Sequence, residues 1–190
     1  VQGLFVGSTW YPNVEALHYF AREILPLLRR HVPEFRLVVA GNVSESRELR
    51  LPPDSGIELL GFVDDLRPHL AASRVFVVPI LRGHGSRLKI LDAAAAGVPV
   101  VSTTKGAEGL TFLDGSEIIL ADDPVEFAGS VIRLLRDDAF AKRLGDAAFE
   151  RVRREYDWSC AGERLEEAFS LLPARRSGRA HAPAIVRSAS

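Results

Sequence analysis

Two basic residues directly follow a glycine-containing segment near the middle of the chain. The segment is residues 83–86, and the two bases are Arg87 and Lys89. The apolar pattern after them is typical of a helix, so both charges fall on its first turn. Free backbone N–H groups at a helix start favour an anion, whereas cations there are unfavourable unless an anion offsets them. The pattern therefore predicts a phosphate site in which Gly85 and Ser86 supply backbone amides. A tight glycine turn beside two solvated bases is the alternative.

The same predicted helix carries a carboxylate, Asp92, five residues after Arg87 and beside the small residues 93–96. An ionised carboxylate offers two acceptor oxygens, and a vicinal diol such as that of a ribose offers two donors. We therefore expect Asp92 to bind a ribose. The alternatives are a place on the surface and an ion pair with Arg87 or Lys89.

Short continuous apolar runs alternate with longer amphipathic stretches along the chain. This pattern is typical of a parallel sheet with helices on both faces, a doubly wound α/β fold. Six strands are expected, at residues 4–6, 37–40, 57–60, 75–78, 98–101 and 118–120. In such a sheet small molecules bind outside the carboxyl ends of the strands, near the point where the strand order reverses. The loops after the strands are therefore the expected ligand site.

Capping residues and periodicity predict the helices. Asn13 is expected to cap a helix whose apolar face extends through residue 28, with a kink or an early end at Pro26. Asp123, followed at once by proline and three residues later by glutamate, predicts a second capped helix. Further helices are expected at residues 66–73, 87–96, 139–154 and 159–172.

The composition is that of an ordinary globular protein, with 190 residues, 47% of them hydrophobic, and a formal net charge of -1. These values exclude disordered, collagen-like and disulfide-rich classes. One domain is expected over residues 1–172, followed by a flexible basic tail at 173–190 that has four arginines and no acidic residue. Contact of this tail with an anionic membrane is left open beside a solvated terminus, and no nucleic-acid partner is expected.

Membrane-spanning and metal-binding classes are not indicated. No apolar run approaches the roughly 20 residues of a membrane-spanning helix, and the first residues lack the basic flank of a secretory signal. We therefore expect a cytoplasmic protein, with peripheral membrane contact left open. The single Cys160 cannot close an intramolecular disulfide, and the five histidines show no compact ligand spacing, so no metal site is expected. The chain starts with Val1 and almost at once with a strand, which suggests a longer protein cut on its N-terminal side.

Residues 85–103 and 106–110 resemble the nucleotide-sugar site of retaining GT-B glycosyltransferases of the group 1, family 4 type. Residues 4–42 are similar to the opening of that family's C-terminal domain, and residues 61–66 resemble its base-binding turn. The resemblance extends from about residue 3 to residue 172. It implies a Rossmann-like doubly wound parallel sheet, the C-terminal half of a GT-B fold.

The signature of this family is a pair of glutamates separated by seven residues, and His84 and Asp92 occupy the matching positions. Asp92 preserves the carboxylate, one methylene shorter, whereas His84 departs from the pattern. The family's basic residue in the loop after the first strand has no counterpart in residues 8–12. The resemblance therefore implies that mainly Arg87 and Lys89 neutralise the negative charge of the phosphates.

The residues that the resemblance implies at the donor site share a place in the loops after the first, third and fourth strands or on the helix that follows. They are Gly7, Ser8, Phe62, Val63, His84, Gly85, Ser86, Leu88 and Asp92 for substrate binding, with Arg87 and Lys89 as the catalytic cations at the diphosphate. Phe62 and Val63 are implied to contact the nucleotide base through their backbone. Gly7 and Ser8 are implied to face the diphosphate.

The implied reaction is transfer of a sugar from a nucleoside-diphosphate sugar to an acceptor hydroxyl, with retained anomeric configuration, no metal, and no cofactor besides the donor. The N-terminal half largely holds the acceptor in this family, so a missing half or a separate chain is the implied partner. Two alternatives stay open: a non-catalytic module that binds a nucleotide or a partner, and half of a sugar-nucleotide epimerase. A nicotinamide dehydrogenase is disfavoured because the first strand is not followed by GxGxxG.

Overall fold

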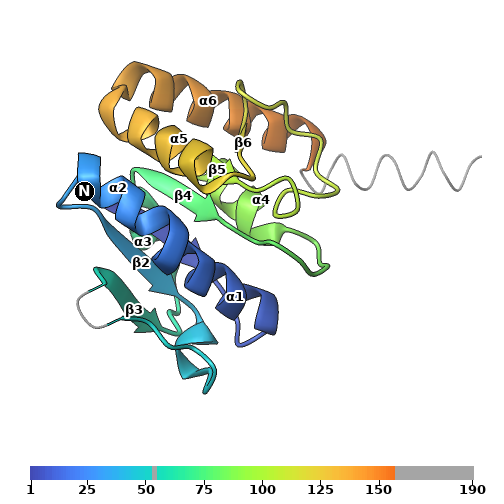
Figure 1. Ribbon diagram of the computed structural model, residues 1–190. Helices are drawn as coiled ribbons and strands as arrows, with labels where there is room; N and C mark the ends of the chain where they lie inside the picture. Colours follow the sequence, from blue (N-terminus) through green and yellow to red (C-terminus); the bar gives the residue numbers. More distant parts are fainter. Residues whose placement is uncertain (53–54, 157–190) are drawn as a thin grey trace, which may run out of the picture. The chain divides into compact units, whose positions relative to one another are not determined.

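Six apolar runs form one parallel sheet in residues 1–52 and 55–156, the part of the chain that this computed structural model describes (Figure 1). Every strand pair in it is parallel. The strands are β1 (Gln2–Val6), β2 (Arg36–Ala40), β3 (Ile57–Gly61), β4 (Val75–Val78), β5 (Val100–Ser102) and β6 (Ile119–Leu120). All six expected strands are confirmed, with bounds that shift by at most two residues.

The strand order is β3-β2-β1-β4-β5-β6, so the order reverses between β1 and β4. This reversal is the topological switch point, where open α/β sheets bind small molecules. All four residues of β4 are buried, as are Gly3, Leu4 and Phe5 of β1. Such continuous burial is expected of central strands that helices cover on both faces. The doubly wound fold is confirmed, and the switch point defines where its ligand site should lie.

Helices cover both faces of the sheet because the chain moves in opposite directions on the two sides of β1, and right-handed crossovers then lie on opposite faces. Two helices and a π-helical segment between them connect β1 to β2, in front of the sheet in Figure 1, and α5 packs against them. α4 connects β4 to β5 and packs against α6. The helical elements are α1 (Tyr11–Tyr19), the π-helical segment (Phe20–Ile24), α2 (Leu25–His31), a 3-10 turn (Asn42–Glu45), α3 (Arg67–Ala71), α4 (Leu88–Ala95), α5 (Pro124–Arg136) and α6 (Asp138–Glu155).

The expected helix cap at Asn13 is wrong. α1 begins two residues earlier, at Tyr11, with Trp10 before it and Pro12 in its first turn. Proline favours this earlier start because the first turn does not need the N–H group that proline lacks. Asn13 is 5% exposed, and its side chain contacts Ser8 and Lys89 instead of capping the helix.

Pro26 interrupts the helix less than expected. α1 gives way to the π-helical segment before the proline, and Pro26 itself lies in the first turn of α2. The wider turns of a π-helical segment accommodate the missing donor, so the helical path continues to His31. Asp123 caps α5 as predicted, since its Oδ1 accepts hydrogen bonds from the backbone N–H groups of Val125 at 2.8 Å and Glu126 at 3.2 Å.

Three other expected helices, 66–73, 87–96 and 139–154, are confirmed as α3, α4 and α6 with ends within two residues. The helix expected at 159–172, the tail at 173–190 and Cys160 lie outside the described residues. None of the described helices combines the length and the apolar character needed to cross a bilayer.

Candidate functional site

A cavity of about 260 Å³ lies at the switch point, beside the carboxyl ends of β1 and β4. The loop after β1, the loop after β4 and the first turn of α4 line this switch-point cavity. Trp10 and Asn13, which were not among the expected site residues, also line it, as does Gly106 from the segment 106–110 that resembles the nucleotide-sugar site. It brings together eight of the eleven expected ones, namely Gly7, Ser8, His84, Gly85, Ser86, Arg87, Leu88 and Lys89.

Lys89 places its ammonium group in the wall of this cavity. Nζ donates a hydrogen bond to Asn13 Oδ1 at 2.8 Å and lies 4.6 Å from the centroid of the Phe5 ring. Burial, together with repulsion from the Arg87 charge, lowers the pKa of Lys89 to about 8. An anion next to a buried cation favours its charged form. Lys89 is therefore suited to bind a phosphate.

Asn13 connects Lys89 to the loop after β1. Its Nδ2 donates to Ser8 O at 3.1 Å and to Ser8 Oγ at 3.3 Å, while its Oδ1 accepts from Lys89. Gly7 leaves room for this side chain, because a Cβ there would lie 3.1 Å from Asn13 Cβ and Cγ and 2.8 Å from the Phe5 ring. The sequence signal that could have indicated this role is an asparagine directly after a proline, following a glycine loop.

Arg87 adopts a left-handed backbone conformation, with φ of 55°, at the residue before α4. Its Nη2 donates to the carbonyl oxygens of Gly83 at 3.3 Å and Lys105 at 2.8 Å. The side chain is 8% exposed, and its Nε has no hydrogen-bond partner among the described residues. The alternative of two solvated bases is therefore wrong, because Arg87 is hydrogen-bonded to two carbonyl oxygens and the half-buried Lys89 to Asn13.

Glu108 and Lys105 form an ion-pair network beside Arg87. Glu108 Oε2 accepts a hydrogen bond from Lys105 Nζ at 2.6 Å and lies 3.5 Å from Arg87 Nη2. The hydrogen bond from Lys105, with the nearby charges of Arg87 and His84, holds the pKa of Glu108 below its usual range. Glu108 thus offsets part of the Arg87 charge, a role that the sequence did not indicate.

Asp92 lies on the same helix as Lys89 but does not line the switch-point cavity. It lines a second cavity of about 510 Å³, together with Leu66 and Arg67. Burial raises the pKa of Asp92 above its ordinary value. In the turn after β3, Phe62 is 73% exposed and Val63 is half-buried. Neither of these two residues lines either cavity, so the structure brings together the residues expected at the phosphate but not those expected at the base.

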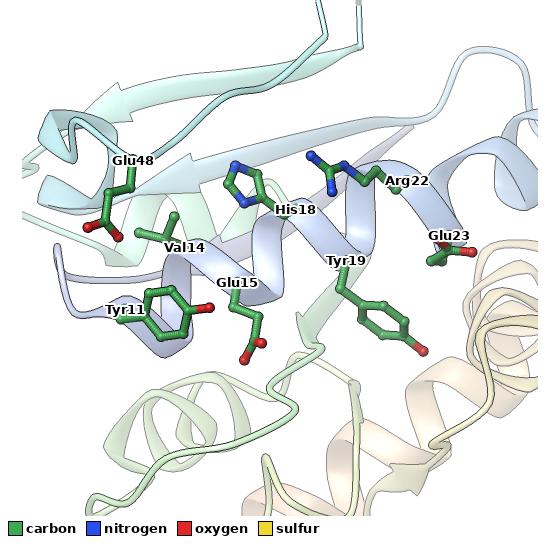
Figure 2. A pocket seen from close by; sticks show the side chains of 8 residues that line it. All are labelled: Tyr11, Val14, Glu15, His18, Tyr19, Arg22, Glu23 and Glu48. Atoms are coloured by element: carbon green, nitrogen blue, oxygen red, sulfur yellow. The ribbon is translucent and has the colours of Figure 1, made fainter.

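A third cavity, of about 350 Å³, lies on the outer face of α1 and the π-helical segment (Figure 2). In Figure 2 His18 and Arg22 point to one side of the helix, and Glu15 and Tyr19 point to the other. His18 Nε2 accepts a hydrogen bond from the Arg50 backbone at 2.9 Å. Burial, with the charges of Arg22 and Arg50, lowers the pKa of His18. None of the expected site residues line this cavity.

Within residues 1–52 and 55–156, no group of three or more His, Cys, Asp or Glu could hold a metal ion.

Comparison with known proteins gives one family. A family model described as "Glycosyl transferases group 1" matches residues 2–137. A GDP-mannose-dependent alpha-(1-6)-phosphatidylinositol monomannoside mannosyltransferase of Mycolicibacterium smegmatis is 33% identical over 171 residues, covering 82% of this chain and 44% of that protein. The chain spans less than half the length of the first curated relatives that it matches.

Solved structures give the same fold. The C-terminal domain of a group 1 family glycosyl transferase, LpcC of Francisella tularensis, matches with a TM-score of 0.67 at 19% identity, over 83% of this chain and 87% of that domain. Anabaena Alr3699/HepE, in complex with UDP and glucose, matches with a TM-score of 0.70 at 16% identity, over 90% of this chain and 48% of that one. The expected Rossmann-like fold is confirmed by both.

Proposed function

The chain belongs to the group 1 glycosyl transferase family, and we propose that it is the donor-binding C-terminal half of a GT-B enzyme. That enzyme would transfer a sugar from a nucleoside-diphosphate sugar to an acceptor hydroxyl. The observation that carries this proposal is the switch-point cavity, in which the buried Lys89 ammonium lies beside the glycine loops and the start of α4. The match to a separate C-terminal domain, the LpcC domain, supports the same assignment.

In this proposal the diphosphate binds over the first turn of α4. Lys89 offers N–H donors and a full positive charge, while Gly85 and Ser86 offer backbone amides next to the helix start. Arg87 contributes through its charge, since its Nη2 group is already hydrogen-bonded to two carbonyl oxygens. Gly7 and Ser8 close the opposite side of the cavity.

The nucleoside would extend along α4 toward Asp92. Leu88 and Asp92 are four residues apart on this helix, which corresponds to about 6 Å at a rise of about 1.5 Å per residue. That separation suits a ribose placed next to its diphosphate, so one helix could bind both. Contact of the base with the turn at Phe62 and Val63 is part of the proposal, because the high exposure of Phe62 leaves this turn available.

The chemical role of the cations follows from the leaving group. As the glycosidic bond to the diphosphate breaks, negative charge grows on the terminal phosphate while the sugar becomes oxocarbenium-like. Fixed cations at that phosphate stabilise the transition state more than the ground state. Lys89 and Arg87 would supply this charge, and in this proposal the transfer proceeds with retention and without a metal ion.

In this proposal the acceptor is held by the N-terminal half of the GT-B enzyme, which lies in the same protein or in a separate chain. The curated relatives are more than twice as long as the matched region, which supports this division. The relative from Mycolicibacterium smegmatis is named as a phosphatidylinositol monomannoside mannosyltransferase. For this chain a cytoplasmic location with peripheral membrane contact remains a proposal. We expect the chain alone to bind nucleotide and to transfer sugar poorly or not at all.

One observation favours a second candidate, a non-catalytic module that binds a nucleotide. His84 stands where the family has the first signature glutamate, so the usual contact to the transferred sugar is altered. Joining the chain to an acceptor half and measuring sugar transfer with and without Arg87→Ala distinguishes the two candidates. Transfer that Arg87→Ala abolishes supports the enzyme, and nucleotide binding without any transfer supports the module.

Calorimetric titration of the chain with UDP, GDP and ADP tests the proposed function directly. We expect one nucleoside diphosphate to bind, with weaker binding by Lys89→Met and Asp92→Asn. Lys142→Met is the matched control, because Lys142 is exposed on α6 and pairs with Asp146. Equal affinity of all four proteins would place the site elsewhere.

A further inference from the structure

We propose that Asn13 is a positioning residue of the donor site, whose single amide group holds the Lys89 ammonium and the Ser8 loop in one arrangement. The inference rests on the proposed function, since it concerns how the same cavity presents its charge to a diphosphate. It assigns a role to a residue that the sequence indicated only as a helix cap.

The contacts of Asn13 join three separate segments. From the first turn of α1, its Nδ2 donates to Ser8 O at 3.1 Å and Ser8 Oγ at 3.3 Å. From α4, 76 residues further along the chain, Lys89 Nζ donates to Asn13 Oδ1 at 2.8 Å. Asn13 is 5% exposed, so water cannot easily replace these bonds. The side chain therefore connects the two sides of the switch-point cavity.

An amide is the side chain that these contacts require. It accepts from a cation through its oxygen and donates to a carbonyl through its nitrogen at the same time. A carboxylate could accept from Lys89 but could not donate to Ser8 O, and an apolar residue could do neither. The opposite polarity of the two neighbours, a cation and a carbonyl oxygen, also fixes which way the amide points.

The arrangement leaves donors of Lys89 for a ligand. An ammonium has three N–H groups, and Asn13 is its one hydrogen-bond acceptor in the described part of the chain. The Phe5 ring, 4.6 Å from Nζ, covers another side of the ammonium without accepting a conventional hydrogen bond. Lys89 lines the cavity, so an anion that enters can accept from its remaining N–H groups.

Because the Asn13 amide is uncharged, it places no negative charge beside Lys89, and this affects the pKa of Lys89. The titratable groups near Lys89 are Arg87 beside it, His84 in the loop after β4, and Glu108, which pairs with Arg87 and not with Lys89. Among residues 1–52 and 55–156, no carboxylate thus pairs with the Lys89 ammonium, whose pKa burial lowers to about 8. A carboxylate at position 13 should raise the pKa of Lys89, whereas loss of the amide should lower it further.

Direct titration of the lysines tests this role without any ligand. The chain has three lysines, Lys89, Lys105 and Lys142, so selective ¹³C labelling gives three NMR signals to assign. We expect the Lys89 midpoint near pH 8 in the unsubstituted protein, higher by about 1 pH unit or more in Asn13→Asp, and lower in Asn13→Ala. The other asparagine of the chain, Asn42, provides the matched control, and Asn42→Asp should leave the midpoint unchanged.

Calorimetry with the tightest-binding nucleoside diphosphate is the second arm, from pH 6 to pH 10. In the unsubstituted protein affinity should fall as the pH rises past about 8, and in Asn13→Asp this fall should move to higher pH. A Lys89 midpoint that is the same in Asn13→Asp and in the unsubstituted protein would overturn the positioning role, even if nucleotide binds. Failure of all nucleotides to bind the unsubstituted protein would instead overturn the proposed function and leave the lysine titration to decide on Asn13. If Asn13→Ala does not fold, the isosteric Asn13→Asp decides alone.

Discussion

Replacing Lys89 by methionine should stabilise the protein at neutral pH while weakening its binding of nucleotide. Burial lowers the pKa of Lys89 from 10.5 to about 8 in the folded protein. At about 1.4 kcal/mol for each pKa unit, keeping this lysine charged costs about 3 kcal/mol of folding free energy. Methionine has a similar length and no charge, so Lys89→Met removes this cost. It also leaves Asn13 Oδ1 without its donor, at about 1–3 kcal/mol, so the net gain at pH 7 is about 0–2 kcal/mol.

The pH dependence of the stability difference between Lys89→Met and the unsubstituted protein is a more specific test than the size of this difference at pH 7. Below pH 8 the lysine is charged in both the folded and the unfolded protein, and the full cost is present. Between about pH 8 and 10.5 the unfolded chain keeps the proton while the folded protein loses it, so the unsubstituted protein gains stability as the pH rises. The advantage of Lys89→Met should therefore shrink by about 3 kcal/mol over this window.

Urea unfolding of both proteins at pH 7, 8.5 and 10 measures the difference. Lys142→Met is the control, because Lys142 is 75% exposed and its removal should give a difference that is small and nearly constant with pH. A constant difference between Lys89→Met and the unsubstituted protein from pH 7 to 10 would refute the buried, charged lysine. The same variant should bind nucleoside diphosphate about 30-fold more weakly, for a lost charge-assisted hydrogen bond of about 2 kcal/mol.

Three further outcomes are expected. In urea unfolding, Gly41→Ala should destabilise the protein by more than Gly115→Ala. Both glycines have a positive φ, but only a Cβ at Gly41 would also lie 2.3 Å from Gly7 O, whereas a Cβ at Gly115 would meet open space. Equal losses of stability would contradict this reasoning. Asp123→Ala should cost about 1 kcal/mol in the same assay, through loss of the α5 cap, and an unchanged midpoint would show that the cap contributes nothing. Once the chain is joined to an acceptor half, Arg87→Ala should slow sugar transfer by about 2–4 kcal/mol of barrier, measured as kcat; an unaffected kcat would remove Arg87 from the reaction.

The sheet and the place of its ligand site could be predicted from the sequence. Buried parallel strands are continuous apolar runs, and β4 (Val75–Val78) is one in which every residue is buried. Because the ends of such strands meet at one edge, the loops after the strands were expected to hold the ligand, and the family resemblance implied that the loop at Gly7 faces it together with residues 83–86. The structure places both in one cavity.

The contacts inside the site could not be predicted, because they depend on tertiary neighbours. Asn13 has a high preference for helix caps, yet its side chain binds Lys89, which is 76 residues away in sequence. The pattern around Arg87 predicted a cation at a phosphate site, but it did not indicate that the carbonyl of Lys105 and the Glu108 carboxylate hold this side chain in the wall. Local periodicity carries no signal for either contact.

A crystal structure of the chain with its tightest-binding nucleoside diphosphate tests the central claim most directly. We predict that the diphosphate lies over the first turn of α4, within hydrogen-bond distance of Lys89 Nζ and the backbone amides of Gly85 and Ser86, with the ribose toward Asp92. A nucleotide bound at the outer face of α1, or anywhere else away from Lys89, would contradict it.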